Sequence, residues 1–207
     1  KNLSKKNCYG FDSFDGLPSA WGNILPKGYF KTKIPTFKQS NIKIIPGLFE
    51  ETLDKFLENH KKKFSLIHID CDLYSSTVYV LNKMYPKMKE TSYLIMDEFY
   101  GYPSYEKYEF KALKEQLNEW DIKPIFITQI TNDINGDKIL FFLNNELKEF
   151  CKINDYFVIK LDEIIKEPLY DSFIDTAHTN EAGSKKIAKI IYPYISDFLK
   201  INLVSNN

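Results

Sequence analysis

The chain alternates short runs of strand-forming residues with amphipathic stretches, and this alternation restricts its fold more than any other feature. Strand-forming runs lie at residues 7–12, 42–45, 64–70 and 92–97. Between two of them, Leu53, Phe56 and Leu57 follow the spacing of one helix face. Strands that alternate with helices predict an α/β fold with a mainly parallel sheet.

The run at residues 64–70 is almost continuously apolar. Such a run is typical of a strand that is covered on both faces. His68 lies inside it, so we expect a core histidine whose ring has hydrogen-bond partners. His60 stands at the end of a lysine-rich helix and is expected at the surface.

Further elements follow the same logic. Helices are expected at 50–60, 75–85 and 105–120, and strands at 124–130 and 138–143, the last two joined at the turn signal Asn135-Gly136. A new pattern begins near residue 145, with a strand at 155–161 and a helix at 181–199 that Thr179 or Asn180 can cap. The sequence therefore predicts two domains, residues 1–146 and a small α/β appendix at 147–207.

Composition narrows the class of protein. The 28 Lys and Arg residues balance 28 Asp and Glu residues, so net charge offers no argument for a nucleic-acid or membrane partner. Three scattered cysteines without CxxC spacing argue against a disulfide framework and a structural zinc site, and favour the cytoplasm. No apolar run approaches the roughly 20 residues that a membrane-spanning helix needs.

Carboxylates stand at the ends of several expected strands. Ligands of parallel α/β sheets bind outside the carboxyl ends of the strands, where Asp70, Asp97 and Glu98 would form a cluster of like charge. A divalent cation such as Mg²⁺ relieves that repulsion and prefers oxygen ligands. Asp72 is a reserve ligand, since alternation along a strand points it the same way as Asp70. The alternative is that these acids are solvated residues at loop entries.

Asp12 ends the first run and has two interpretations. It is either a turn residue ahead of Asp15-Gly16 or a strand-end carboxylate that binds a ribose hydroxyl.

Four ordered sequence blocks resemble the macrocin O-methyltransferases of the TylF/MycF type. The blocks are residues 11–18, 46–53, 67–77 and 96–100. The resemblance implies a Rossmann-like class I methyltransferase that uses S-adenosylmethionine and Mg²⁺ or another divalent cation. It implies a small-molecule or glycan substrate, methylated on a sugar hydroxyl.

The resemblance also implies roles for individual residues. Asp70, Asp97 and Glu98 match the metal positions, with Glu98 where Asp is more usual. Asp70 and Asp72 are the catalytic candidates, with Asp72 as general base, and Asp12, Gly47 and Phe49 are the candidates for cofactor binding.

The chain departs from the family at its start. The family's first strand, which is central to the sheet, and its glycine-rich turn would precede Asn7, and no GxGxxG-like sequence occurs. We therefore expect a sheet without its first strand and an incomplete cofactor site, as in a truncated chain.

The tail resembles the last block of SGNH/GDSL hydrolases. In Phe173–Gly183, Asp175 and His178 match that family's DxxH pair. The alternatives are therefore a fragment of an SGNH-type esterase or deacetylase and a non-catalytic remnant. No Gly-Asp-Ser block supplies a nucleophile, and a DxxH pair without a serine cannot perform acyl transfer, so a structural strand and helix is favoured. The sequence leaves homo-oligomerisation open.

Overall fold

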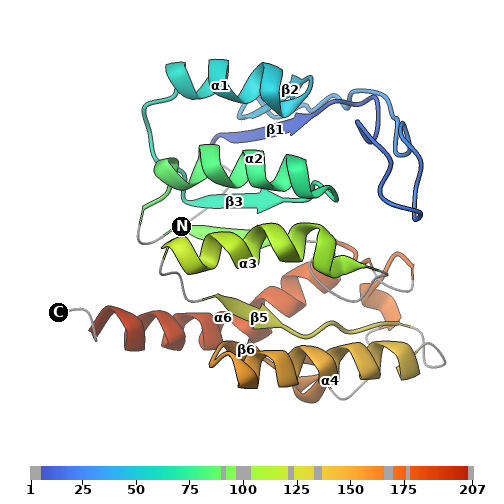
Figure 1. Cartoon of the computed structure of the whole chain (residues 1–207). Helices are drawn as coiled ribbons and strands as arrows, with labels where there is room; N and C mark the ends of the chain where they lie inside the picture. The colour runs from blue at the N-terminus through green and yellow to red at the C-terminus, as the bar shows by residue number, and fades with distance from the viewer. Residues whose placement is uncertain are drawn as a thin grey trace. The chain divides into compact units, whose positions relative to one another are not determined.

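The chain divides into two compact units, residues 1–120 and residues 121–207. The structure is a computed structural model that describes residues 6–89, 92–96, 104–120, 124–132, 137–165, 170–175 and 178–204. We describe each unit by itself (Figure 1). Within the described residues, no helix combines the length and the hydrophobicity that crossing a bilayer requires.

The first unit confirms the expected order of strands and helices. Its strands are β1 (Cys8–Asp12), β2 (Ile42–Pro46), β3 (Leu66–Ile69) and β4 (Tyr93–Met96). Its helices are α1 (Phe49–Asn59), α2 (Tyr74–Met84) and α3 (Glu109–Trp120), with the short 3-10 turns η2 (Tyr85–Lys87) and η3 (Tyr105–Lys107). The expected helix at 105–120 is thus a 3-10 turn followed by an α-helix.

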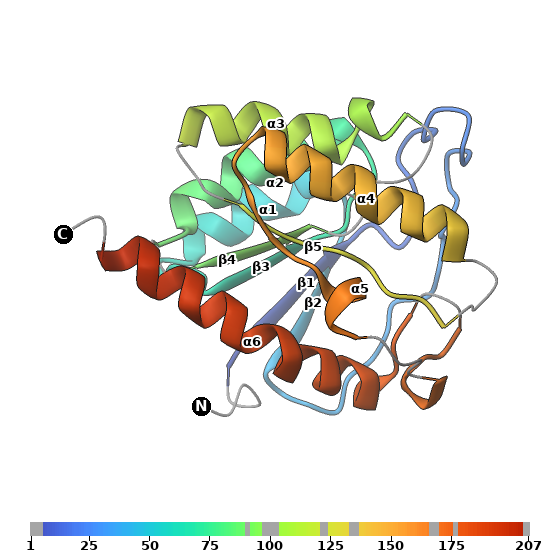
Figure 2. The same cartoon turned by 90° about the horizontal axis from the view of Figure 1, so that it is seen from below.

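The strands of this unit form two parallel pairs. β1 pairs with β2, and β3 pairs with β4 in a register that sets Ile69 opposite Met96. Among the described residues, no hydrogen-bonded ladder joins one pair to the other. β1 and β3 are the neighbouring members of the two pairs in both views (Figures 1 and 2). The expectation of a sheet that lacks its first strand stays a prediction.

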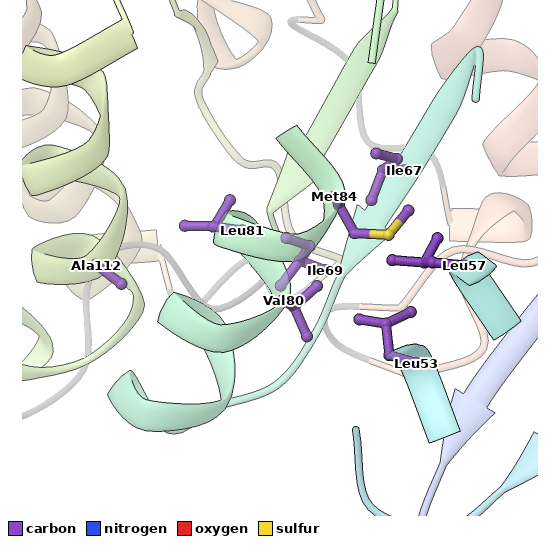
Figure 3. Packing of buried hydrophobic residues seen from close by; sticks show 8 residues of the cluster. All are labelled: Leu53, Leu57, Ile67, Ile69, Val80, Leu81, Met84 and Ala112. Carbon is purple, nitrogen blue, oxygen red and sulfur yellow. The ribbon is translucent and has the colours of Figure 1, made fainter. Parts of the chain in front are cut away.

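One face of these strands carries the core of the first unit. α1 contributes through residues four apart, Leu53 and Leu57, as an amphipathic helix should. Figure 3 shows how side chains from α1, β3, α2 and α3 meet. The cluster consists of Leu53, Leu57, Ile67, Ile69, Val80, Leu81, Met84 and Ala112.

The expectation that β3 is covered on both faces is wrong in this structure. Ile67 and Ile69 are buried, but Leu66 is 54% exposed and His68 is exposed on the opposite face. Tyr93 and Ile95 of β4 are 42% and 47% exposed. His68 is therefore not a core histidine, because the helices of this unit cover only the face of Ile67 and Ile69.

His60 was expected at the surface but is half-buried in an aromatic stack. Its ring lies nearly parallel to Phe56 at 5.0 Å and to Phe64 at 4.7 Å between centroids. Tyr9 of β1 meets the same ring edge-on at 5.3 Å. The stack joins the end of α1 to β1 and to the residues that lead into β3.

The second unit contains one parallel strand pair and its helices. The pair is β5 (Ile125–Ile127) with β6 (Phe157–Ile159). The helices are α4 (Asp137–Ile153), α5 (Leu161–Ile164), the 3-10 turn η4 (Tyr170–Ser172) and α6 (Glu181–Val204). The expected cap of α6 is confirmed, because the Asn180 side chain accepts a hydrogen bond from the Gly183 N–H at 2.9 Å.

The expected strand at 138–143 is wrong, since these residues begin α4. Asn144, Leu147 and Cys151 are buried at helical spacing, whereas Phe141 is 64% exposed. The Asn144 amide bonds both the N–H and the carbonyl of Gln129. The turn signal Asn135-Gly136 lies outside the described residues. The domain division at 146/147 stays a prediction, and α4 runs across it.

Candidate functional site at the carboxyl ends of the strands

A cleft in the first unit lies at the carboxyl ends of β1 and β3. Its cavity volume is about 110 Å³. Every residue predicted from the sequence for this site and described by the structure lines it. These residues are Asp12, Gly47, Phe49, Asp70 and Asp72. The structure thus brings together the candidate metal ligand, general base and cofactor residues.

Asp70 and Asp72 occupy a tight connection between β3 and α2. Asp72 has a φ of +58°, a left-handed conformation that Asp tolerates better than most residues. Leu73 is then buried, and its carbonyl accepts the hydrogen bond of Thr77 in α2. This turn places two carboxylates, two residues apart, on one edge of the cleft.

Glu109 holds this turn through hydrogen bonds to its backbone. It is the first residue of α3, and its side chain is fully buried. Oε1 accepts hydrogen bonds from the backbone N–H of Cys71 at 2.9 Å and of Asp72 at 3.1 Å. Oε2 has no hydrogen-bond partner among the described residues. Glu109 therefore fixes the backbone of the residues that carry the candidate chemistry.

The environment of Glu109 is unfavourable for a negative charge. Burial raises the pKa of its carboxyl to about 7, and the charges of Asp72 and Asp70 act in the same direction. The two backbone N–H groups lower this pKa in part. Burial likewise raises the pKa of the Cys71 thiol, which disfavours the thiolate form that acts as a nucleophile.

Sequence reasoning missed Glu109, although a signal was present. Glu109 stands three and four residues before the buried Ala112 and Leu113, in register with the apolar stripe of α3. An acid on the buried face of a helix needs a partner, and this partner lies 38 residues away in the sequence.

The residues around Asp12 build the other edge of the cleft. The Asp12 carboxylate accepts a hydrogen bond from the Phe14 N–H at 2.6 Å, and its carbonyl accepts one from Gly47 at 2.9 Å. Asp12 is thus a turn residue, and it also lines the cleft. Gly47 has a φ of +131°, and a Cβ there would lie 2.8 Å from the Thr52 methyl carbon. Phe49 follows at the start of α1.

Asp97 and Glu98, the other candidate metal ligands, lie outside the described residues. They follow Met96, the register partner of Ile69, in the sequence. Among the residues that the structure does describe, no three acidic, His or Cys side chains gather to hold a metal ion. Asp70 and Asp72 supply the hard oxygen donors that suit Mg²⁺.

The predicted hydrolase pair of the second unit is also in contact. His178 Nδ1 lies 2.7 Å from Asp175 Oδ2, and the His178 N–H donates to Asp175 Oδ1 at 2.7 Å. The side chains of His178 and Asp175 are 79% and 53% exposed. The antiparallel bridge between Phe173 and Thr179 closes the turn that contains them.

The first unit is an α/β structure whose parallel strands deliver carboxylates to one cleft, a class of fold that binds ligands at this edge. Residues 1–128 match the family model described as macrocin-O-methyltransferase (TylF). Because the match spans more than half of the chain, the chain belongs to the macrocin O-methyltransferase family. The resemblance predicted from the four blocks is thereby confirmed, whereas the SGNH-like tail stays a prediction.

Solved structures of methyltransferases are similar to part of the chain. A structure of CalS11, a calicheamicin methyltransferase, has a TM-score of 0.48 and 22% identity, over 64% of this chain and 58% of that one. The O-methyltransferase NovP has a TM-score of 0.40 and 22% identity, over 63% and 57%. The chain thus spans less than two thirds of their length. A search of curated proteins found no match.

Proposed function

We propose that the chain takes part in the transfer of a methyl group from S-adenosylmethionine to a sugar hydroxyl, assisted by a divalent cation. The observation that carries this proposal is the pair Asp70 and Asp72, delivered by a turn that the buried Glu109 holds, in a family of O-methyltransferases. The acceptor would be a small glycosylated molecule or a glycan.

Methyl transfer needs an oxygen nucleophile aligned with the sulfonium methyl group. The new bond joins the acceptor oxygen to the methyl carbon, the sulfur–carbon bond breaks with its electron pair on sulfur, and the hydroxyl proton leaves. We assign the proton to the Asp72 carboxylate as general base. The fixed backbone at Asp72 would keep this carboxylate in place during the reaction.

The donor set fits a hard divalent cation. A bound Mg²⁺ would lower the pKa of the acceptor hydroxyl and orient it. Asp70 would hold it, and we propose Asp97 and Glu98 as the remaining protein ligands. Asp12, Gly47 and Phe49 are proposed to contact the cofactor, with the Gly47 backbone open to close approach because it carries no Cβ.

Calorimetric titration of the chain with S-adenosylmethionine in the presence of Mg²⁺ tests the proposal. We expect binding that weakens when Mg²⁺ is removed, and transfer of a labelled methyl group to a glycoside mixture. Absence of any heat of binding at millimolar cofactor would remove the proposal for this chain.

For the second unit we propose a structural role of the Asp175–His178 pair. Both Asp175 oxygens bond to His178, the Ile174 N–H bonds the His178 carbonyl at 2.7 Å, and the turn leads into the capped start of α6. Treatment with a fluorophosphonate probe should leave the chain unlabelled. Labelling of a serine would instead support an esterase or deacetylase.

A further inference from the structure

The segment of residues 27–38, here called the lysine–aromatic segment, has an unusual charge and exposure. No acidic residue occurs between Asp15 and Glu50, whereas the segment carries Lys27, Lys31, Lys33 and Lys38. Its large apolar side chains are also exposed. Tyr29 is 48%, Phe30 57%, Ile34 52% and Phe37 49% exposed. In a chain of zero net charge, this stretch concentrates positive charge and aromatic surface.

The start of the segment is anchored to the first unit. Tyr29 and Gly28 exchange backbone hydrogen bonds with Leu17, each at 2.9 Å, and the Thr32 N–H bonds the Phe14 carbonyl at 3.1 Å. The preceding residues pack through the buried Trp21 and Leu17 against Leu73, next to the Asp70–Asp72 turn. The segment therefore leaves the fold at a defined place beside the cleft.

Phe30 connects the segment to the cleft. Its side chain lines the same cavity as Asp70 and Asp72 although it is more than half exposed. Its φ is +67°, a left-handed conformation that bulky residues rarely adopt. The Tyr29 ring meets it edge-on with centroids 4.8 Å apart. Strained backbone conformations cluster at functional sites, so Phe30, which has one and also lines the cleft, is a candidate for ligand contact.

The cleft and the segment carry opposite charges. Asp12, Glu50, Asp70 and Asp72 line the cleft. In the segment, Lys31 pairs with Asp15 at 2.7 Å, whereas the structure gives Lys27, Lys33 and Lys38 no ion pair with any described residue. A ligand that spans both regions would therefore present hydroxyl groups to the carboxylates and negative charge to the lysines.

We infer that the acceptor is a sugar that bears phosphate, with its hydroxyl group at the cleft and its phosphate on the lysine–aromatic segment. The inference rests on the proposed function. Lysines bind phosphate as point charges, and the exposed rings of Tyr29 and Phe30 offer stacking faces for a sugar or a base. A nucleoside diphosphate sugar and a phosphorylated glycan share this chemistry.

Binding measurements without cofactor test the inference separately from methyl transfer. UDP-glucose, glucose 1-phosphate and methyl glucoside are titrated into the chain. We expect the two phosphates to bind, methyl glucoside to bind at least tenfold more weakly, and the affinity for phosphates to fall with added NaCl. Tighter binding of UDP-glucose than of glucose 1-phosphate would indicate a nucleotide sugar, and equal binding a phosphorylated glycan.

Paired lysine variants locate the site. Lys27→Gln with Lys33→Gln, on the two sides of Phe30, should weaken phosphate-sugar binding about fivefold, as expected for two exposed charge contacts. Lys61→Gln with Lys62→Gln removes the same charge from exposed positions ahead of β3 and should leave the affinity unchanged. Phe30→Ala should weaken UDP-glucose more than glucose 1-phosphate.

Several outcomes would overturn the inference. Equal affinity for methyl glucoside, or equal losses in the two lysine pairs, would show that the segment does not recognise phosphate. Sedimentation with phosphatidylglycerol vesicles, without binding of either phosphate sugar, would identify a membrane-binding segment instead. Binding of S-adenosylmethionine without binding of either phosphate sugar would overturn this inference alone. Phosphate-sugar binding without cofactor binding would remove methyl transfer and retain the lysine site.

Discussion

The two groups of chemistry-bearing residues, one in each unit, differ in how the surrounding chain holds them. Asp70 and Asp72 line a cleft. The fully buried Glu109 carboxylate of α3 accepts hydrogen bonds from the backbone N–H groups of Cys71, which lies between them, and of Asp72 itself. Asp175 and His178 bond to each other, and their side chains are 53% and 79% exposed. A functional site needs support that fixes its geometry, and Glu109 of α3 gives the first group such support from a distant part of the sequence.

The comparison shows that a contact between two residues of catalytic type is weak evidence that they catalyse a reaction. The Asp175–His178 distance of 2.7 Å suits a catalytic pair, but the same contact closes a turn ahead of α6. The Asp70–Asp72 turn is different, because Glu109 stays buried there although burial disfavours its charge. The predictions below test this difference, beginning with the largest effect.

Replacement of Asp70 should remove activity. In Asp70→Asn, the loss of one carboxylate charge at the cleft should lower methyl transfer by at least about a hundredfold, or about 3 kcal/mol. Turnover with labelled S-adenosylmethionine measures the effect. Asp54→Asn is the matched control, since Asp54 pairs with Lys83 away from the cleft and should retain activity. Equal activity of the two variants would contradict the proposal that Asp70 is needed for methyl transfer.

Gly183→Ala should destabilise the second unit. A Cβ at Gly183 would lie 2.0 Å from the Ser172 carbonyl oxygen, a backbone atom that cannot move aside alone. The overpacking should reduce the free energy of unfolding by about 2 to 3 kcal/mol, measured by urea denaturation. Lys186→Ala, at an exposed position of α6, should change it by less than about 0.5 kcal/mol. A small loss at Gly183 would mean that the turn of Asp175 and His178 is not firmly attached to α6.

Glu109→Gln should change how stability depends on pH. The folded chain holds a proton on Glu109 up to a pKa of about 7, above the ordinary 4.5. Between these values the folded state binds more protons than the unfolded state, so stability falls as pH rises from about 4.5 to about 7. Glutamine does not ionise, so the variant should gain on the order of 2 kcal/mol over the wild type at pH 8.

Urea denaturation at pH 5 and pH 8 measures this gain. At pH 5, where Glu109 is mostly protonated, the two proteins should differ little. Glu119→Gln, on an exposed position of α3, serves as the control. If the free energies of unfolding of wild type and Glu109→Gln differed by the same amount at pH 5 and pH 8, the raised pKa of Glu109 would be contradicted.

His178→Ala should have the smallest effect. The His178 side chain is 79% exposed, and exposed ion pairs contribute between zero and about 1 kcal/mol. We therefore expect a loss of less than about 0.5 kcal/mol in stability and no change in methyl transfer. A large loss of stability or of methyl transfer would show that the Asp175–His178 pair, like the Asp70–Asp72 turn, is needed for the fold or the activity.

Sequence patterns predicted elements well where local spacing and burial agree. The stripe of Leu53 and Leu57 gave α1 within one residue, and the carboxylates of β1 and β3 lie at one cleft as expected. The pattern failed at residues 138–143, where a strand-forming run belongs to a helix. There the burial of Asn144, Leu147 and Cys151 outweighed local propensity.

Other features depend on contacts between distant residues and were beyond local patterns. An apolar run predicts a buried strand, but which face of β3 is covered depends on where α1, α2 and α3 pack. The burial of Glu109 could be read from the apolar stripe of α3, but its hydrogen-bond partners could not, because they are backbone N–H groups of the distant Cys71 and Asp72. A single sequence contains no spacing that links them.

The stacking of His60 between Phe56 and Phe64 gives the protein a built-in spectroscopic reporter. The chain has three histidines, and the His60 imidazole lies nearly parallel to two benzene rings, with centroids 5.0 and 4.7 Å away. Ring currents from both neighbours should shift the carbon-bound protons of His60 upfield in a proton NMR spectrum. His68 on a strand face and His178 in its exposed turn provide two reference signals, so unfolding of the first unit can be followed without any label.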